Sequence, residues 1–376
     1  MAKVLIESLS YSVTFNTPRS SRHDLISAKR LPLEKIWTPL EAIALWKSVA
    51  QDYQLIHSFN GIPYTNKPWI VTFEVYLPYL EEGRSQIFQS IIQQRLALDN
   101  CRKIIAMSNY AKMRFIKKLE NWHFLPDIIN KVEVIHPNLP LKASHPKLYE
   151  NKPNLNLVFV GNSFARKGGI VVLRLAKKAH QIGVPIHFHV ISGLSLGHSV
   201  TDHGDVQRYE NDLKLLDLPN ITFYKSLPNQ QVLQLLAQSH FQIMPSLYDT
   251  YGYSILEGFS VGTPAITTNI AALPEFVHHN QNGYLLSVDL SENRTWHSFF
   301  KQVDKNSNQY WEILDTTYNN WADQALHHIG EFLERSDRQE HYEFLSAGAI
   351  NRVKTVHNSE TINDLLDNIY SEAIGE

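Results

Sequence analysis

Residues 241–269 read FQIMPSLYDTYGYSILEGFSVGTPAITTN, and this stretch decides the fold class. The apolar run at 241–246 predicts a buried strand, 253–261 predicts a helix, and 263–269 predicts a second strand. Two strands joined by a helical crossover of this kind lie parallel in one sheet. We therefore expect an α/β fold, in which ligands bind at the carboxyl ends of the strands.

The same alternation of short apolar runs and helical segments continues in both directions from this stretch. It predicts further helices at 40–51, 85–99, 169–182, 206–216 and 230–238, and mainly helical structure after residue 291. Further strands are expected at 3–9, 54–59, 69–74, 103–108 and 131–136 in the first half, and at 155–162, 185–193 and 220–226 in the second.

The chain is expected to form two domains, because 376 residues are too many for one ordinary core. The segment 136–156 contains several prolines and little periodicity, which is typical of a linker. We expect a Rossmann-like domain at 1–140, a second one at 141–350 that faces it across a cleft, and a surface-packing amphipathic helix at 351–376.

Composition narrows the class of protein. Hydrophobic residues make up 43% of the chain and charged residues 19%, as in globular proteins, and the net charge of −2 argues against nucleic acid as a partner. One cysteine, Cys101, cannot form an internal disulfide. The N-terminus lacks a signal-peptide pattern, and no apolar stretch is long enough to span a membrane. We expect a cytoplasmic protein.

The chemistry begins where the strand 241–246 ends. Tyr251, Gly252, Tyr253 and Ser254 open the following helix, whose exposed N–H groups and positive dipole end suit a phosphate. Glu257 lies one turn further on, where its carboxylate can accept two hydrogen bonds from a ribose diol, and Asp249 precedes the turn. The alternative is an ordinary helix cap and one buried acid with a local partner.

A second candidate stretch is LVFVGNSFARKGG at 157–169, where a strand runs into a glycine turn. Gly161 and Asn162 begin the turn, and Arg166 and Lys167 follow just before the next helix. The GxxxxGK[ST] pattern of a Walker A loop is absent. The cations and glycine amides can nevertheless neutralise a diphosphate leaving group. Alternatively, the stretch is a solvated surface turn.

Taken in order, these motifs resemble the family 4 glycosyltransferases of GT-B fold. The likeness is carried by VFVGNSFARKGG at 158–169 and by the run from NITFYKS at 220–226 to NGYLL at 282–286, and it is weaker at CRKIIAMSNYAKMRF, 101–115, and KVEVIHPN, 131–138. The resemblance implies two Rossmann-like domains, with the last helix crossing back to the first domain. It also implies transfer from a nucleotide-sugar with retention of configuration, and no metal or other cofactor.

The resemblance also implies residue roles. Lys167 matches the family lysine that contacts the donor diphosphate, and Glu257 matches the acid that binds the nucleotide ribose. Asp249 stands in the place of the acid that contacts the donor sugar. Base recognition is expected near Tyr224. The predicted donor-binding set is Gly161, Asn162, Arg166, Lys167, Tyr224, Lys225, Leu227, Tyr251, Gly252, Tyr253, Ser254 and Glu257, and the predicted catalytic set is Glu74, Lys167 and Asp249.

Four features depart from the family pattern. Asp249 replaces the usual glutamate, which shortens its reach by one methylene. Asn162 follows Gly161 where the family usually has an arginine, so Arg166 is the candidate to supply that charge. Glu74 stands where many members have a histidine near the reacting centre; a carboxylate there is competent as a general base. No glycine precedes Gly61, so the glycine-rich loop that often follows the first strand is missing.

We therefore predict a glycosyltransferase that moves a hexose-like sugar from a nucleotide diphosphate donor to a hydroxyl acceptor, which is a glycan, a lipid-linked acceptor or a small molecule. The alternatives are a non-catalytic nucleotide-sugar-binding subunit and a nucleotide-sugar epimerase of the same fold.

His57 ends a strand and is an acceptor-side candidate or a structural histidine. Residues 102–124 carry six Lys/Arg before residue 119, which is typical of a peripheral membrane contact or of a solvated helix.

Overall fold

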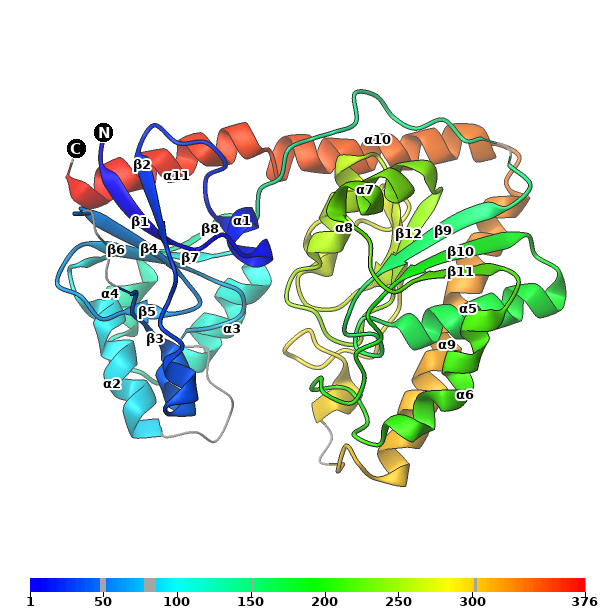
Figure 1. Ribbon diagram of the computed structural model, residues 1–376, viewed down its shortest axis with the longest axis horizontal. Helices are drawn as coiled ribbons and strands as arrows, with labels where there is room; N and C mark the ends of the chain where they lie inside the picture. Colours follow the sequence, from blue (N-terminus) through cyan, green and yellow to red (C-terminus); the bar gives the residue numbers. More distant parts are fainter. Residues whose placement is uncertain (48–51, 78–85, 151, 301–302, 376) are drawn as a thin grey trace. The chain divides into compact units, whose positions relative to one another are not determined.

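The computed structural model describes residues 1–47, 52–77, 86–150, 152–300 and 303–375, which form two compact units (Figure 1). Unit 1 comprises Met1–Pro140 and Val356–Glu376, and unit 2 comprises Leu141–Thr355. The chain thus enters unit 2 within the region expected as a linker. It returns to unit 1 five residues later than the predicted boundary at 350.

Unit 1 is built on a parallel sheet whose strands follow the order β2-β1-β4-β6-β7-β8. The central strands β4 and β6 are buried almost throughout, as in a sheet covered on both sides. Helices α2 (Gln86–Ala97), α3 (Asn109–Leu119) and α4 (Leu125–Ile129) contribute to the core of one face. The strands are β1 (Lys3–Glu7), β2 (Asp24–Ala28), β4 (Leu55–Phe59), β6 (Trp69–Phe73), β7 (Cys101–Ala106) and β8 (Val132–Val134), and α1 covers Tyr11–Asn16.

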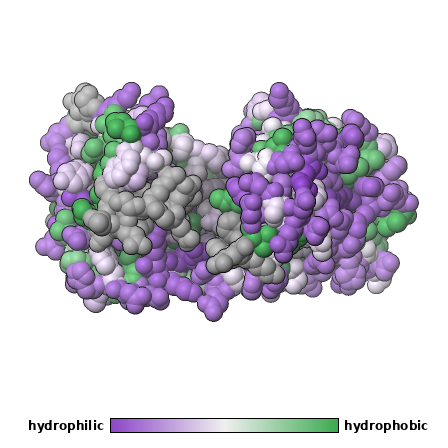
Figure 2. Space-filling model, turned by 90° about the horizontal axis from the view of Figure 1, so that it is seen from below, coloured by the Kyte–Doolittle hydropathy of each residue, from purple (hydrophilic) through white to green (hydrophobic). Residues whose placement is uncertain are grey.

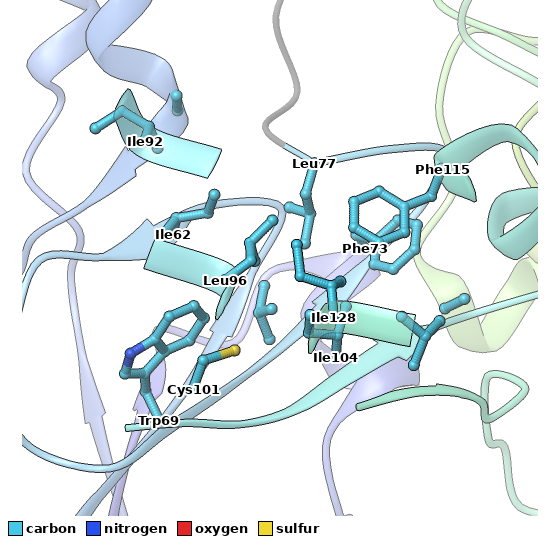
Figure 3. Packing of buried hydrophobic residues seen from close by; sticks show 14 of the residues in the cluster. Ile62, Trp69, Phe73, Leu77, Ile92, Leu96, Cys101, Ile104, Phe115 and Ile128 are labelled. Atoms are coloured by element: carbon cyan, nitrogen blue, oxygen red, sulfur yellow. The ribbon is translucent and has the colours of Figure 1, made fainter. Parts of the chain in front are cut away.

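Figure 3 shows the core on this face, where Trp69 lies beside Cys101 and Phe73 faces Phe115. The rings of Phe73 and Phe115 are 4.9 Å apart between centroids. Burial raises the pKa of the Cys101 thiol to about 12, so this cysteine is a packing residue.

The other face of the unit 1 sheet is covered by the last helix, α11 (Ser359–Ile374) (Figure 1). The Tyr370 hydroxyl lies 2.7 Å from Nδ1 of His57, whose Nε2 lies 2.8 Å from the Thr72 hydroxyl. His57 is only 2% exposed, and burial lowers the pKa of its ring to about 3. The role of His57 is therefore structural, and its candidacy on the acceptor side is wrong.

Two predictions for unit 1 differ from the structure. The helix expected at 40–51 is wrong over its described part, where a 3₁₀ helix, η2 (Thr38–Ala42), leads into the short strand β3 (Ile43–Ala44); residues 48–51 lie outside the described residues. β3 pairs with β5 (Ile62–Pro63). Strand β2 was not predicted, because it is an edge strand that is partly exposed and lacks a continuous apolar run.

Unit 2 repeats the arrangement with a parallel sheet of order β11-β10-β9-β12-β13-β14. Its strands are β9 (Leu155–Val160), β10 (Ile186–Ile191), β11 (Ile221–Tyr224), β12 (Phe241–Met244), β13 (Ala265–Thr268) and β14 (Gly283–Leu286). Its main helices are α5 (Gly169–Ile182), α7 (Asn229–Gln238), α8 (Tyr253–Ser260), α9 (Asn308–Glu334) and α10 (Arg338–Val356).

One detail of unit 2 matters for the site, and two of its elements differ from the predicted ones. Strands β9 and β12 are neighbours, with Phe241 opposite Leu157, so the loops that leave their carboxyl ends lie side by side. The helix predicted at 206–216 is divided into η3 (Val206–Tyr209), α6 (Glu210–Leu213) and η4 (Lys214–Asp217). The unpredicted strand β14 extends the sheet beyond β13.

Within the described ranges, every helix is too short or too polar to cross a membrane. On the face shown in Figure 2, hydrophobic residues are scattered among hydrophilic ones.

Candidate active site

The loops that follow β9 and β12 are locked together by backbone contacts. Gly168 has a φ of +86°, and a Cβ atom at this position would lie 2.1 Å from the Pro245 carbonyl oxygen. The Leu247 N–H donates to the Arg166 carbonyl at 2.8 Å, and the Arg166 guanidinium donates to the Tyr248 carbonyl at 2.7 Å. The two stretches that the sequence singled out therefore form one rigid edge of the sheet.

Lys167 and Asp249 form an ion pair across these two loops. Their side chains are 18% and 6% exposed, and the Tyr251 N–H donates to the second oxygen of Asp249 at 3.3 Å. Burial alone raises the pKa of Asp249, but the charges of Lys167 and Arg166 and the two hydrogen bonds outweigh it and hold the pKa below its usual value. Asp249 is therefore a carboxylate that offsets the charge of Lys167.

Two helices begin at this edge, each with a glycine in the left-handed region. Gly168 precedes α5, and Gly252, with a φ of +94°, precedes α8; neither end has a side-chain cap among the described residues. A Cβ atom at Gly252 would lie 2.7 Å from Leu273 Cδ2. Ser254 points its hydroxyl to the Met244 sulfur at 3.2 Å. Uncapped helix starts beside Arg166 and Lys167 can hold an anion with two phosphates.

Glu257 lies on α8, one turn beyond Ser254, and is 8% exposed. Its Oε1 accepts a hydrogen bond from the Asn229 side chain at 2.8 Å. Asn229 is exposed at the first position of α7, and the sequence analysis missed it because the two residues are distant in the chain. A neutral amide leaves the charge of Glu257 in place, so the carboxylate retains the capacity to bind a diol.

The turn at Gly161 and Asn162 is held by a third loop, which follows β10. The Asn162 side chain accepts from the Gly193 N–H at 3.1 Å, and its carbonyl accepts from the Ser195 N–H at 3.0 Å. A Cβ atom at Gly161 would lie 3.0 Å from Lys167 Cβ, so a side chain there would press on the lysine. Asn162 thus acts as an anchor of the turn in the structure.

The remaining predicted residues of unit 2 differ in their exposure. Tyr224, at the end of β11, is half-buried, and its ring stacks with that of His189 at 6.2 Å between centroids. Lys225 is exposed. Leu227 packs against a buried hydrophobic cluster. The Tyr251 side chain is fully buried and stacks on Phe276 at 5.1 Å. The Tyr251 ring is therefore part of the core, so a contact of this residue with a phosphate would be made by its backbone.

Glu74 belongs to unit 1, whereas the donor-side candidates belong to unit 2. It follows β6, is half-buried, and its backbone N–H donates to the Asn60 side chain at 3.0 Å. Over the parts of the chain that the structure describes, no group of three or more His, Cys, Asp or Glu could hold a metal ion.

Residues 142–305 match a family model described as "Glycosyl transferases group 1". Over 168 residues the chain is 25% identical to an "Uncharacterized 41.2 kDa protein in cps region" of Klebsiella pneumoniae, covering 43% of this chain and 42% of that protein. Over 206 residues it is 22% identical to the phosphatidylinositol N-acetylglucosaminyltransferase GPI3 subunit of Saccharomyces cerevisiae (strain YJM789), covering 52% and 42%. The chain therefore spans less than half the length of these curated relatives.

Solved structures are similar over almost the whole chain. The crystal structure of Anabaena Alr3699/HepE in complex with UDP and glucose matches 99% of this chain and 100% of that one, with a TM-score of 0.58 and 13% identity. At this identity the likeness shows the fold. Together with the two parallel sheets, it confirms the GT-B fold class expected from the sequence.

Proposed function

We propose that this chain, whose residues 142–305 match the family model of the group 1 glycosyl transferases, moves a sugar from a nucleotide diphosphate-sugar to a hydroxyl acceptor. The observation that carries the proposal lies at adjacent strand ends of unit 2. There Arg166 and Lys167 stand beside two uncapped helix starts, with Glu257 one turn beyond the second. This set suits a diphosphate joined to a ribose.

The chemistry that we propose is electrostatic stabilisation of the leaving group. When the bond between the sugar and the diphosphate breaks, negative charge develops on the diphosphate, and fixed N–H groups and cations stabilise that charge. Lys167 lies just before the start of α5, and Asp249 fixes its position before the donor binds. Glu257 binds the ribose.

The reaction that we propose retains the configuration of the sugar and needs no metal. An acceptor hydroxyl attacks from the face that the diphosphate leaves, and Glu74 receives its proton or contacts the donor sugar. Turnover that persists in a chelator would support the absence of a metal, and an inverted product would contradict retention. The acceptor class that we propose is a glycan or a lipid-linked sugar.

A peripheral membrane contact is a further part of the proposal. Lys117 and Lys118 are exposed at the end of α3, whereas Trp122 and Phe124 pack partly against the core of unit 1. The contact that we propose is therefore electrostatic and is made to anionic headgroups of the cytoplasmic membrane face.

Sedimentation with phosphatidylserine-containing vesicles tests this contact. We expect Lys117→Glu/Lys118→Glu to lower the bound fraction several-fold, because about 1 kcal/mol is lost for each cation near such a surface. Lys214→Glu, an exposed lysine of unit 2, is the control and should bind as the wild type does. Equal binding to purely neutral vesicles would contradict the proposal.

The main experiment is a screen of UDP-, GDP-, ADP- and dTDP-linked sugars for thermal stabilisation, followed by turnover with the best donor. UDP-sugars come first because the HepE structure named above holds UDP and glucose. We expect Glu257→Ala to weaken donor binding by about 10- to 100-fold, because hydrogen bonds to a charged group are worth about 1.5–3 kcal/mol.

The matched control is Glu343→Ala, which removes an exposed carboxylate from α10 and should leave donor binding unchanged. Stabilisation by a donor without transfer or release of its sugar would favour a nucleotide-sugar-binding subunit. Recovery of the donor with an inverted hydroxyl would favour an epimerase. Absence of binding to all four donor classes would overturn the proposal.

A further inference from the structure

The loop that follows β10 contains a buried acid, Asp202, which is 1% exposed. One oxygen of its carboxylate, Oδ2, accepts the Gly197 N–H at 3.0 Å and the Ser199 N–H at 3.4 Å. Asp202 therefore closes the loop 193–202 on itself. Removal of this carboxylate would leave two backbone donors without their acceptor.

The closed loop is also hydrogen-bonded to the cationic turn, which follows β9 and carries Arg166 and Lys167. The Ser195 N–H donates to the Asn162 carbonyl at 3.0 Å, and the Phe164 N–H donates to the Ser195 carbonyl at 2.9 Å. Phe164 also accepts the Gly169 N–H at 2.7 Å through its carbonyl, at the start of α5. Arg166 and Lys167 lie between these two anchors. Asp202 thus fixes the loop that is hydrogen-bonded, through Ser195, to the turn just before both cations.

The bracing by Asp202 uses one oxygen of its carboxylate. The other, Oδ1, is buried and has no hydrogen-bond partner among the described residues. Burial raises the pKa of Asp202, whereas the two backbone hydrogen bonds and the charges of Arg166 and Lys305 act in the opposite direction. The contacts that tie Asp202 to the site are therefore its two backbone hydrogen bonds.

We propose that Asp202 is a positioning residue for the diphosphate site: it braces the loop 193–199, which holds the turn that carries Arg166 and Lys167 in place to receive the donor phosphates. The inference rests on the proposed function. It differs from what simple charge counting predicts, because the loss of a negative charge near an anion site should strengthen diphosphate binding. Positioning predicts that binding weakens instead.

The test measures UDP binding by isothermal titration calorimetry, with native circular dichroism confirmed for each variant. We expect Asp202→Ala, which leaves the two backbone donors without an acceptor, to weaken UDP binding on the order of tenfold. Asp202→Asn keeps an oxygen for the two backbone donors, so it should bind UDP within about threefold of the wild type. Asp205→Ala removes an exposed acid from the same connection and serves as the control.

A double-mutant cycle identifies the route of the effect. In an Arg166→Met background, Asp202→Ala should weaken UDP binding less than it does in the wild-type background, because part of its effect passes through the position of Arg166. Fully additive effects, or unchanged or tighter UDP binding in Asp202→Ala, would overturn the inference. If the wild type binds none of UDP, GDP, ADP and dTDP, the proposed function fails and the inference fails with it.

Discussion

Replacement of Gly168 with alanine is expected to lower the free energy of unfolding of unit 2 by at least about 3 kcal/mol. The left-handed backbone, with a φ of +86°, costs a non-glycine residue about 1 kcal/mol. The larger part comes from the new Cβ atom, which would lie 2.1 Å from the Pro245 carbonyl oxygen, and backbone at a helix start cannot move away cheaply. The two site loops would be forced apart.

Gly183, at the other end of α5, provides the matched control. It has a φ of +72°, and a Cβ atom there would meet nothing within 4 Å. Gly183→Ala should therefore cost only the backbone strain, about 1 kcal/mol. Guanidinium denaturation followed by circular dichroism measures both variants. Equal losses would show that Gly168 is needed for its conformation alone and would contradict the close packing of the two loops.

Replacement of Lys167 with methionine should destabilise unit 2 by about 2–3 kcal/mol at neutral pH, because it leaves the buried Asp249 carboxylate without its cation. The matched control is Lys178→Met, which breaks a 2.5 Å ion pair from the following helix, α5, to Asp323. That pair is 29% and 61% exposed, so its loss should cost less than about 1 kcal/mol. Asp249→Asn in the Lys167→Met background should recover part of the loss.

The pH dependence supplies an independent check of the same pair. In the wild type the pKa of Asp249 lies below its usual value, so its contribution to stability is present at neutral pH and is lost only as the pH falls through that lowered pKa. Without Lys167, burial becomes the main influence and should raise the pKa. The deficit of Lys167→Met should therefore shrink between pH 7 and about pH 4. A deficit independent of pH would contradict the charge argument.

The sequence was most informative where strands are buried on both faces. Continuous apolar runs such as those of β6 and β12 predicted both sheets, and the ends of these strands located the site loops. Strand β2, with its partly exposed edge pattern, gave no such signal. The segment 40–51 was misread because a helical spacing of apolar residues also occurs where a 3₁₀ turn leads into a short strand.

The contacts within the site were harder to predict than its members. Asn229 meets Glu257, and Asp202 braces the cationic turn, only because loops that are distant in the chain converge at one edge of the sheet. No local pattern encodes such pairs. Tyr251 is the opposite case. Its position in the motif suggested a contact with the ligand, but its side chain lies in the core, where it stacks on Phe276.

The placement of α11 has a consequence for how the chain acquires its structure during synthesis. Ile362, Leu366 and Ile369 cover one face of the unit 1 sheet, yet they are translated after all of unit 2. Until then, the apolar face formed by residues such as Val4 and Ile70 has no helix to cover it. The first unit to leave the ribosome is thus the last to be completed, and its nascent strands present an aggregation-prone surface in the meantime.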